Sequence, residues 1–368
     1  MPTTTSLTFV TKTKLPALAD YVRLLEGVWD NHQVTNNGPL VRQLEDELAR
    51  YLGVPHLVLV ANGTVAIQLA LRDAGLTEGV ITTPYSYVAT TNALLWEGLR
   101  PVFADVDPTT LCLDPQRVAE AITPRVSGIL ATHVYGFPCD HERLRALAEE
   151  HNLKVIYDAA HAFGVRDDGG SILQYGDYAT LSFHATKVYH TVEGGAVVTA
   201  DAEAAERLRL LRSFGHVGED YRQIGINAKM SELHAGVGLL NLRTVGDQLQ
   251  QRAALFDHYR TALAPLGDRL RLLEPRSAAL HWNHAYCPVL FRTGADRDRA
   301  EAALRAVGII VRRYFGQPLN RLPHVTAASC PVAESACRRV LCLPFYPDLP
   351  AGTVDRIAGV LRSEPLAA

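Results

Sequence analysis

The chain has 368 residues, of which 48% are hydrophobic and 20% are charged, and its formal net charge is −3 at pH 7. Acidic and basic residues are interspersed, so we expect no basic surface for nucleic acid or for an anionic membrane. No apolar run is long enough to span a bilayer, and residues 1–5 lack the charged and apolar regions of a signal peptide, so a cytoplasmic protein is expected.

Between about residues 40 and 200, short apolar runs alternate with helical patterns. Helices are predicted over residues 41–52, 64–75, 86–97 and 140–151. Strands are predicted over residues 57–60, 80–83, 101–106, 127–133, 154–157, 178–183 and 196–199. This alternation predicts an α/β fold with a mostly parallel sheet between two layers of helices. Ligands of such sheets bind beyond the carboxyl ends of the strands.

After about residue 230 the pattern changes. Helical stretches at 230–262, 296–307 and 352–362 alternate with strand-like segments at 283–291 and 309–314. We therefore predict a large domain over residues 1–240 and a smaller C-terminal α/β domain over residues 241–368. The six cysteines show no spacing typical of metal ligands, so we expect buried thiols and no metal site.

Two residues near predicted strand ends indicate a chemistry. Asp158 ends one apolar strand, and Lys187 follows the strand at 178–183, shortly before Glu193 and two glycines. A pyridoxal phosphate (PLP) enzyme needs a lysine that holds the cofactor as a Schiff base and an acid that keeps its pyridine nitrogen protonated. Taken alone, Asp158 is equally consistent with a helix N-cap, and a lysine with the protein surface. Together they predict a PLP enzyme.

Four further positions fit the same site. Gly63 and Thr64 follow a strand and open a helix, which is typical of a phosphate site or of an ordinary N-cap. Ser182 is placed to donate its hydroxyl to the same phosphate. Tyr87 opens the next helix and is expected either to stack on the pyridine ring or to pack in the core. His161 is expected to contact the ring or to pack beside it.

The order of these motifs resembles that of the sugar-nucleotide aminotransferases of the DegT/DnrJ/StrS family, which belong to fold type I of the PLP enzymes. The resemblance covers roughly residues 30–350. The segments that carry it are 62–64, 83–87, 158–164, 182–195 and 225–233.

The resemblance implies roles for individual residues. Lys187 would hold the cofactor and carry the proton, and Asp158 would pair with the pyridine nitrogen. The remaining cofactor contacts would come from Gly63, Thr64, Tyr87, His161 and Ser182. Asn227 would reach the cofactor phosphate of a neighbouring subunit, which implies a homodimer with sites at its interface. His184 and Tyr314 would lie on the substrate side.

The resemblance also implies the reaction. The run at 182–195 is most similar to family members that transfer an amino group from L-glutamate to dTDP-4-keto-6-deoxy-D-glucose, giving dTDP-4-amino-4,6-dideoxy-D-glucose. Alternatives are amination of a 3-keto sugar, a PLP-dependent sugar dehydratase and a non-catalytic PLP-binding regulator. Dehydratases of this scaffold carry histidine where this chain has Lys187. The nucleotide and the stereochemistry of the new amine stay open.

Overall fold

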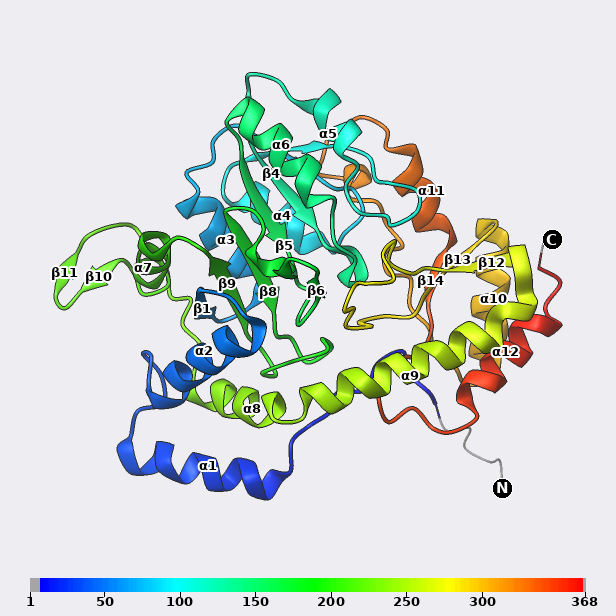
Figure 1. Cartoon of the computed structure of the whole chain (residues 1–368), viewed down its shortest axis with the longest axis horizontal. Helices are drawn as coiled ribbons and strands as arrows, with labels where there is room; N and C mark the ends of the chain where they lie inside the picture. Colours follow the sequence, from blue (N-terminus) through cyan, green and yellow to red (C-terminus); the bar gives the residue numbers. More distant parts are fainter. Residues whose placement is uncertain (1–6, 367–368) are drawn as a thin grey trace.

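The computed structural model describes residues 7–366 and is organised around a seven-stranded sheet with the order β1-β9-β8-β5-β4-β2-β3 (Figure 1). Its strands are β1 (His56–Val60), β2 (Gly79–Thr82), β3 (Arg100–Phe103), β4 (Val126–Thr132), β5 (Lys154–Asp158), β8 (Tyr178–Ser182) and β9 (Gly195–Thr199). The predicted α/β fold with a mostly parallel sheet is confirmed. However, β9 runs antiparallel to both β1 and β8, because the loop that joins it to β8 contains no crossover helix.

Helices cover both faces of this sheet, because its strands are apolar on both sides. Along β1, Leu57 and Leu59 join one core cluster, whereas Val58 and Val60 join the other. The helices on the Val58 side are α3 (Gly63–Asp73), α4 (Val88–Trp96) and α7 (Ala202–Leu211). Those on the Leu57 side are α2 (Pro39–Leu52), α5 (Pro115–Ala121), α6 (His141–His151) and α8 (Glu232–Leu242), and α1 (Leu18–Asn31) packs against α8.

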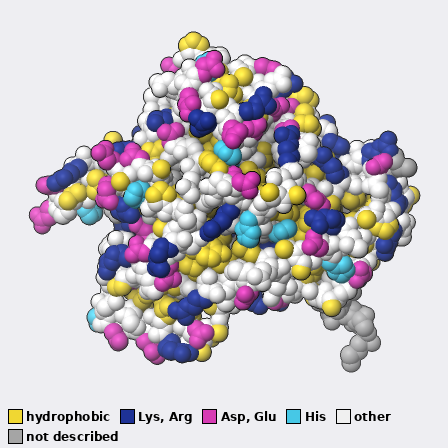
Figure 2. Space-filling model, in the orientation of Figure 1, with side chains coloured by type: hydrophobic (Ala, Val, Ile, Leu, Met, Phe, Trp, Pro, Cys, Tyr) yellow, Lys and Arg dark blue, Asp and Glu magenta, His cyan; other side chains and the backbone are white. Residues whose placement is uncertain are grey.

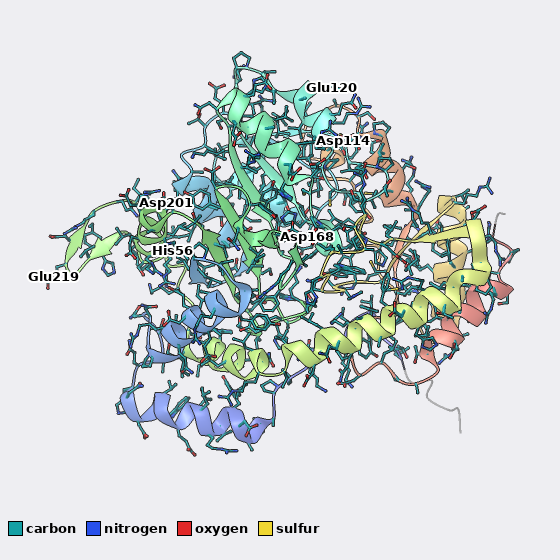
Figure 3. All side chains as sticks on the ribbon, viewed as in Figure 1. His56, Asp114, Glu120, Asp168, Asp201 and Glu219 are labelled. Carbon is teal, nitrogen blue, oxygen red and sulfur yellow. The ribbon has the colours of Figure 1, made fainter. Side chains whose placement is uncertain are left out.

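Acidic side chains define where two of these helices begin. Asp114 accepts a hydrogen bond from the backbone N of Gln116 at 2.9 Å and caps α5, and Asp201 caps α7 through Glu203 N at 2.8 Å (Figure 3). Each carboxylate satisfies an amide that the first helical turn leaves unpaired. Both acids lie at the periphery of the molecule (Figure 3), and their role there is to cap helices.

The C-terminal part forms a second, antiparallel sheet of β12 (Leu270–Leu272), β13 (Pro288–Phe291) and β14 (Val340–Cys342). Its helices are α9 (Val245–Leu263), α10 (Gly294–Ala306), α11 (Pro331–Arg339) and α12 (Thr353–Ser363). Two short hairpins complete the strands: β6 (Arg166–Asp167) with β7 (Gly170–Ser171), and β10 (His216–Val217) with β11 (Asp220–Tyr221). The 3₁₀ segments are η1 (Val134–Gly136), η2 (Ile172–Gln174), η3 (Ala264–Arg269) and η4 (Leu319–Arg321).

Three C-terminal expectations were wrong in detail. Of the strand-like segment expected over residues 283–291, only β13 (Pro288–Phe291) is a strand. Residues 309–314 form no strand, because Ile309 bridges Thr8 and Arg312 bridges Cys342 as isolated pairs. The helical stretch at 230–262 is divided between α8 and α9. The domain boundary at residue 240 stays a prediction. The N-terminal segment joins the C-terminal part, since Phe345 N donates to Val10 O at 2.9 Å.

A buried ion pair ties α2 to α7. The carboxylate of Glu45 accepts hydrogen bonds from Arg212 Nη1 and Arg209 Nη2, each at 2.9 Å, and from Leu59 N at 3.0 Å. Removing one partner of such a pair leaves an uncompensated charge and costs about 3–5 kcal/mol. The contact therefore fixes the position of β1, whose carboxyl end faces the site described below.

No helix within residues 7–366 has the length and apolar character needed to cross a membrane. The same part of the chain holds no group of three or more His, Cys, Asp or Glu side chains arranged for a metal ion. All six cysteines are buried and form no disulfide, as expected. Side chains of both charges are interspersed on the face shown in Figure 2.

Candidate active site

A cavity of about 280 Å³ opens where β1, β5 and β8 end. Since these strands run in the same direction, their carboxyl ends meet at one edge of the sheet, where α/β proteins bind ligands. The predicted site residues that line the cavity are Gly63, Thr64, Tyr87, Asp158, His161, Ser182, His184, Lys187 and Tyr314. The structure thus brings nine of the ten predicted positions together, and Asn227 lies elsewhere.

Asp158 is the last residue of β5, and it is only 5% exposed. Its Oδ2 accepts a hydrogen bond from Thr90 Oγ1 at 2.7 Å, and its Oδ1 accepts one from Ala160 N at 3.1 Å. Burial raises the pKa of Asp158, and the two hydrogen bonds and the charge of Lys187 oppose that rise. Within residues 7–366 the carboxylate has no ion-pair partner. The N-cap alternative is wrong, because residues 159–164 form turns and not a helix.

Lys187 lies in the loop after β8, where its backbone N donates to His184 O at 2.9 Å. Its side chain is half-buried and lines the cavity. Burial lowers the pKa of Lys187 from 10.5 to about 8, and the nearby Asp158 carboxylate limits the fall. A substantial fraction of this amine is therefore neutral and nucleophilic near neutral pH.

The start of α3 provides the anion-binding end of the cavity. Asn62 caps this helix by accepting a hydrogen bond from Val65 N at 2.9 Å, so the ordinary N-cap alternative is correct, and the same helix start also lines the cavity. Gly63 lies so close to Ser182 that a Cβ at position 63 would come within 2.7 Å of the serine Cβ. The helix N-terminus and the hydroxyls of Thr64 and Ser182 therefore suit a phosphate group.

His161 and Tyr87 border the cavity in different ways. His161 is buried, and its Nδ1 accepts a hydrogen bond from Tyr135 N at 3.2 Å. Burial and the charge of Lys187 hold the pKa of His161 well below 6.5, so the ring is neutral and carries its hydrogen on Nε2. Tyr87 is 59% exposed, which excludes the core-packing alternative and leaves its ring free to face a ligand.

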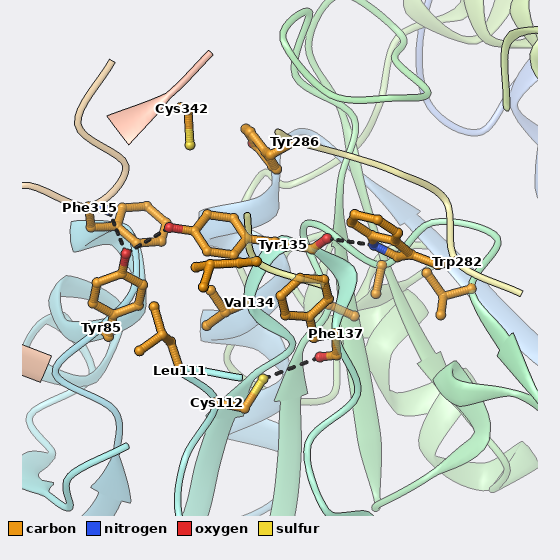
Figure 4. Packing of buried hydrophobic residues seen from close by; sticks show 14 of the residues in the cluster. Tyr85, Leu111, Cys112, Val134, Tyr135, Phe137, Trp282, Tyr286, Phe315 and Cys342 are labelled. Atoms are coloured by element: carbon orange, nitrogen blue, oxygen red, sulfur yellow. Dashed lines mark hydrogen bonds between the residues drawn. The ribbon is translucent and has the colours of Figure 1, made fainter. Parts of the chain in front are cut away.

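A C-terminal loop closes one side of the cavity. Arg312, Tyr314 and Phe315 line it, and Arg312 Nη1 donates to the Tyr314 hydroxyl at 2.6 Å. Two buried tyrosines hold this loop. Tyr135 donates its hydroxyl hydrogen to the Tyr314 carbonyl. The Tyr85 hydroxyl lies 2.7 Å from that of Tyr135, as Figure 4 shows. The site expected from the sequence included Tyr314 but not Arg312, whose guanidinium also lines the cavity.

His184 and Asn227 need separate description. His184 Nδ1 lies 2.8 Å from Thr186 Oγ1, and its Nε2 lies 3.6 Å from a carboxylate oxygen of Glu193, which also lines the cavity. Asn227 is exposed, and its backbone bridges that of Ser213. A role for Asn227 in a site of this same subunit is therefore unsupported.

Sequence reasoning missed the buried hydroxyls behind Asp158. Thr90, Ser86 and Thr132 are each less than 4% exposed, and Thr90 contacts the carboxylate directly. A signal existed: Ser86 and Thr90 are hydroxyl residues in a segment, 86–97, that was expected to be a largely apolar helix. What these hydroxyls contact depends on the packing of α4 against the sheet.

The chain is similar to proteins of known family and structure. A model of the DegT/DnrJ/EryC1/StrS aminotransferase family matches residues 19–362. A dTDP-4-amino-4,6-dideoxy-D-glucose transaminase from Shigella dysenteriae is 42% identical over 361 residues, which cover 96% of this chain and 98% of that protein. The crystal structure of DesI in the presence of its TDP-sugar product has a TM-score of 0.91 at 37% identity, covering 97% of this chain and 92% of DesI. NtdA from Bacillus subtilis with bound cofactor PMP has a TM-score of 0.86 at 30% identity, covering 94% and 81%. The chain therefore belongs to the DegT/DnrJ/EryC1/StrS aminotransferase family.

Proposed function

We propose that this chain is a PLP-dependent aminotransferase that transfers an amino group from L-glutamate to dTDP-4-keto-6-deoxy-D-glucose, forming dTDP-4-amino-4,6-dideoxy-D-glucose. The observation that carries this proposal is the meeting of Lys187 and Asp158 in one cavity with the N-terminus of α3. The activity named for the Shigella relative and the TDP-sugar product of DesI support the choice of substrate.

The cavity fits PLP in three respects. Asp158 is a buried carboxylate with hydrogen-bond donors but no ion-pair partner within residues 7–366, as a cationic pyridine nitrogen requires. Lys187 is an amine with a lowered pKa. Gly63, Thr64 and Ser182 line the cavity at the start of α3, where the helix N-terminus suits a phosphate. When bound, PLP supplies an electron sink that stabilises negative charge on the substrate carbon.

Three side chains of this subunit have separate roles in the proposed reaction. Lys187 Nζ would hold the cofactor and would be the group that moves a proton to and from the substrate carbon. Its pKa of about 8 suits it to both directions of transfer near neutral pH. Asp158 would keep the pyridine nitrogen of the bound cofactor protonated. Arg312, at the mouth, provides a cation for the anionic groups that both substrates carry.

The active unit in this proposal is a homodimer to which Asn227 contributes in trans. The hairpin of β10 and β11 projects from the body of the molecule (Figure 1), and Glu219 lies at its tip (Figure 3). Large apolar side chains near it are exposed, including Tyr221 at 80% and Ile224 at 84%. Exposed apolar groups beside an exposed Asn227 are typical of a surface that a second copy covers.

Product analysis tests the reaction. The protein is incubated with PLP, L-glutamate and either dTDP-4-keto-6-deoxy-D-glucose or its 3-keto isomer, and products are identified by mass and NMR. An amine at carbon 4 is expected. An amine only at carbon 3 would contradict the regiochemistry, loss of oxygen would indicate a dehydratase, and PLP binding without any product would indicate a regulator.

Subunit complementation tests the role of Asn227. Lys187→Ala and Asn227→Ala are each expected to be inactive as homodimers. In a mixed dimer, one site combines an intact Lys187 with an intact Asn227 of the other subunit, so refolding the two variants together should restore activity. If mixing restores nothing while gel filtration shows that hybrids form, Asn227 does not act across the interface.

A further inference from the structure

A line of buried hydroxyls runs to Asp158 from two other elements. Thr132 ends β4, Ser86 precedes α4, and Thr90 lies within α4. Thr132 Oγ1 lies 3.2 Å from Ser86 Oγ, Ser86 Oγ lies 2.7 Å from Thr90 Oγ1, and Thr90 Oγ1 lies 2.7 Å from Asp158 Oδ2. Ser86 and Thr132 also border the cavity, whereas Thr90 lies behind it.

The hydrogens of these hydroxyls point in one direction. An ionised carboxylate only accepts, so the hydrogen of Thr90 goes to Asp158. The oxygen of Thr90 is then free to accept from Ser86, and the oxygen of Ser86 accepts from Thr132. A proton on Oδ2 of Asp158 would require all three hydroxyls to turn around. In a buried environment such an aligned chain strengthens its last hydrogen bond.

We propose that Thr90, supported by Ser86 and Thr132, is a positioning residue that keeps Asp158 ionised and oriented for the pyridine nitrogen of the cofactor. The inference rests on the proposed function, because it requires PLP in this cavity. Thr90 acts through Asp158 and needs no contact with either substrate.

The balance of effects on Asp158 supports this role. Burial raises the pKa of the carboxyl group, and the hydrogen bond from Thr90 is the largest of the effects that lower it, ahead of Ala160 N and Lys187. Without Thr90, the acid would hold a proton more readily and the pyridine nitrogen would lose its own at lower pH. The cofactor would then withdraw electrons less strongly from the substrate carbon.

The test compares Thr90→Val with Thr90→Ser. Each variant is loaded with PLP labelled with ¹⁵N in the ring, and the nitrogen chemical shift is followed against pH. In the wild type and in T90S, the ring nitrogen is expected to stay protonated across the pH range in which the protein is stable. In T90V, the ring nitrogen is expected to lose its proton at a lower pH than in the wild type. Loss of a hydrogen bond to a charged group should also weaken PLP binding to the cofactor-free protein about 10-fold or more, measured by fluorescence titration.

Thr91 offers a matched control in the same helix. Its hydroxyl is buried and has no partner within residues 7–366, so T91V should titrate and bind PLP as the wild type does. A folded T90V with wild-type titration and affinity would overturn the inference, as would equal losses in T91V. If T90V does not fold, Ser86→Ala must shift the titration in the same direction for the inference to stand. Failure of the wild type to bind PLP would instead overturn the proposed function.

Discussion

The lowered pKa of Lys187 predicts an unusually reactive amine in the cofactor-free protein. At pH 7, a lysine with a pKa of about 8 is roughly 10% deprotonated, whereas one at 10.5 is about 0.03% deprotonated. The reactive fraction of Lys187 should therefore exceed that of an ordinary lysine roughly 300-fold. Since the neutral form gains as pH rises, reactivity should climb through about pH 8 and level off above it.

Competitive labelling measures this fraction directly. Cofactor-free protein is treated with a trace of acetic anhydride at a series of pH values, and the acetylated peptides are quantified by mass spectrometry. The chain has five lysines, and the exposed Lys12 provides an internal reference. In Asp158→Asn, the negative charge that raises the pKa of Lys187 is gone, so the labelling midpoint should move to lower pH.

Two results would refute this reasoning. A midpoint near 10.5 in the wild type would show that the cavity does not penalise the ammonium form. A midpoint that rises in D158N would show that Asp158 does not stabilise the charge of Lys187. The Lys187→Arg variant, which lacks the acetylated peptide, identifies the signal.

Two further predictions concern the architecture of the site. Gly63→Ala should weaken PLP binding, because the new Cβ would lie 2.7 Å from that of Ser182. Gly27→Ala is the control and should bind PLP normally, because nothing lies within 4 Å of its new Cβ. Equal PLP affinities of the two variants in fluorescence titration would contradict the argument. Glu45→Gln should lower the free energy of unfolding by about 3–5 kcal/mol in urea denaturation, because it strands a buried guanidinium. Glu149→Gln, which removes an exposed i,i+4 pair, should cost at most about 0.5 kcal/mol, and a similar loss in both variants would count against a special role of the buried pair.

Local patterns in the sequence located most of the central sheet and most of the predicted site. Apolar runs and helical periodicity depend on which faces of an element are buried, so they were sufficient to place β5 and the start of α3. They were insufficient for β9, because its reversed direction depends on how the loop after β8 folds back. They also failed at 309–314, where backbone pairing involves partners from both ends of the chain.

By itself, the sequence determined that Asp158, Lys187 and a helix N-terminus lie at strand ends, since each position is marked by its immediate neighbours. Only the tertiary structure decided what surrounds them: Thr90 behind the carboxylate, Arg312 at the mouth and Asn227 away from the cavity. These contacts join elements distant in the chain, and hydrogen-bond partners are chosen by packing, which leaves no local pattern. The same holds for the pKa of Lys187, because burial comes from side chains on several elements.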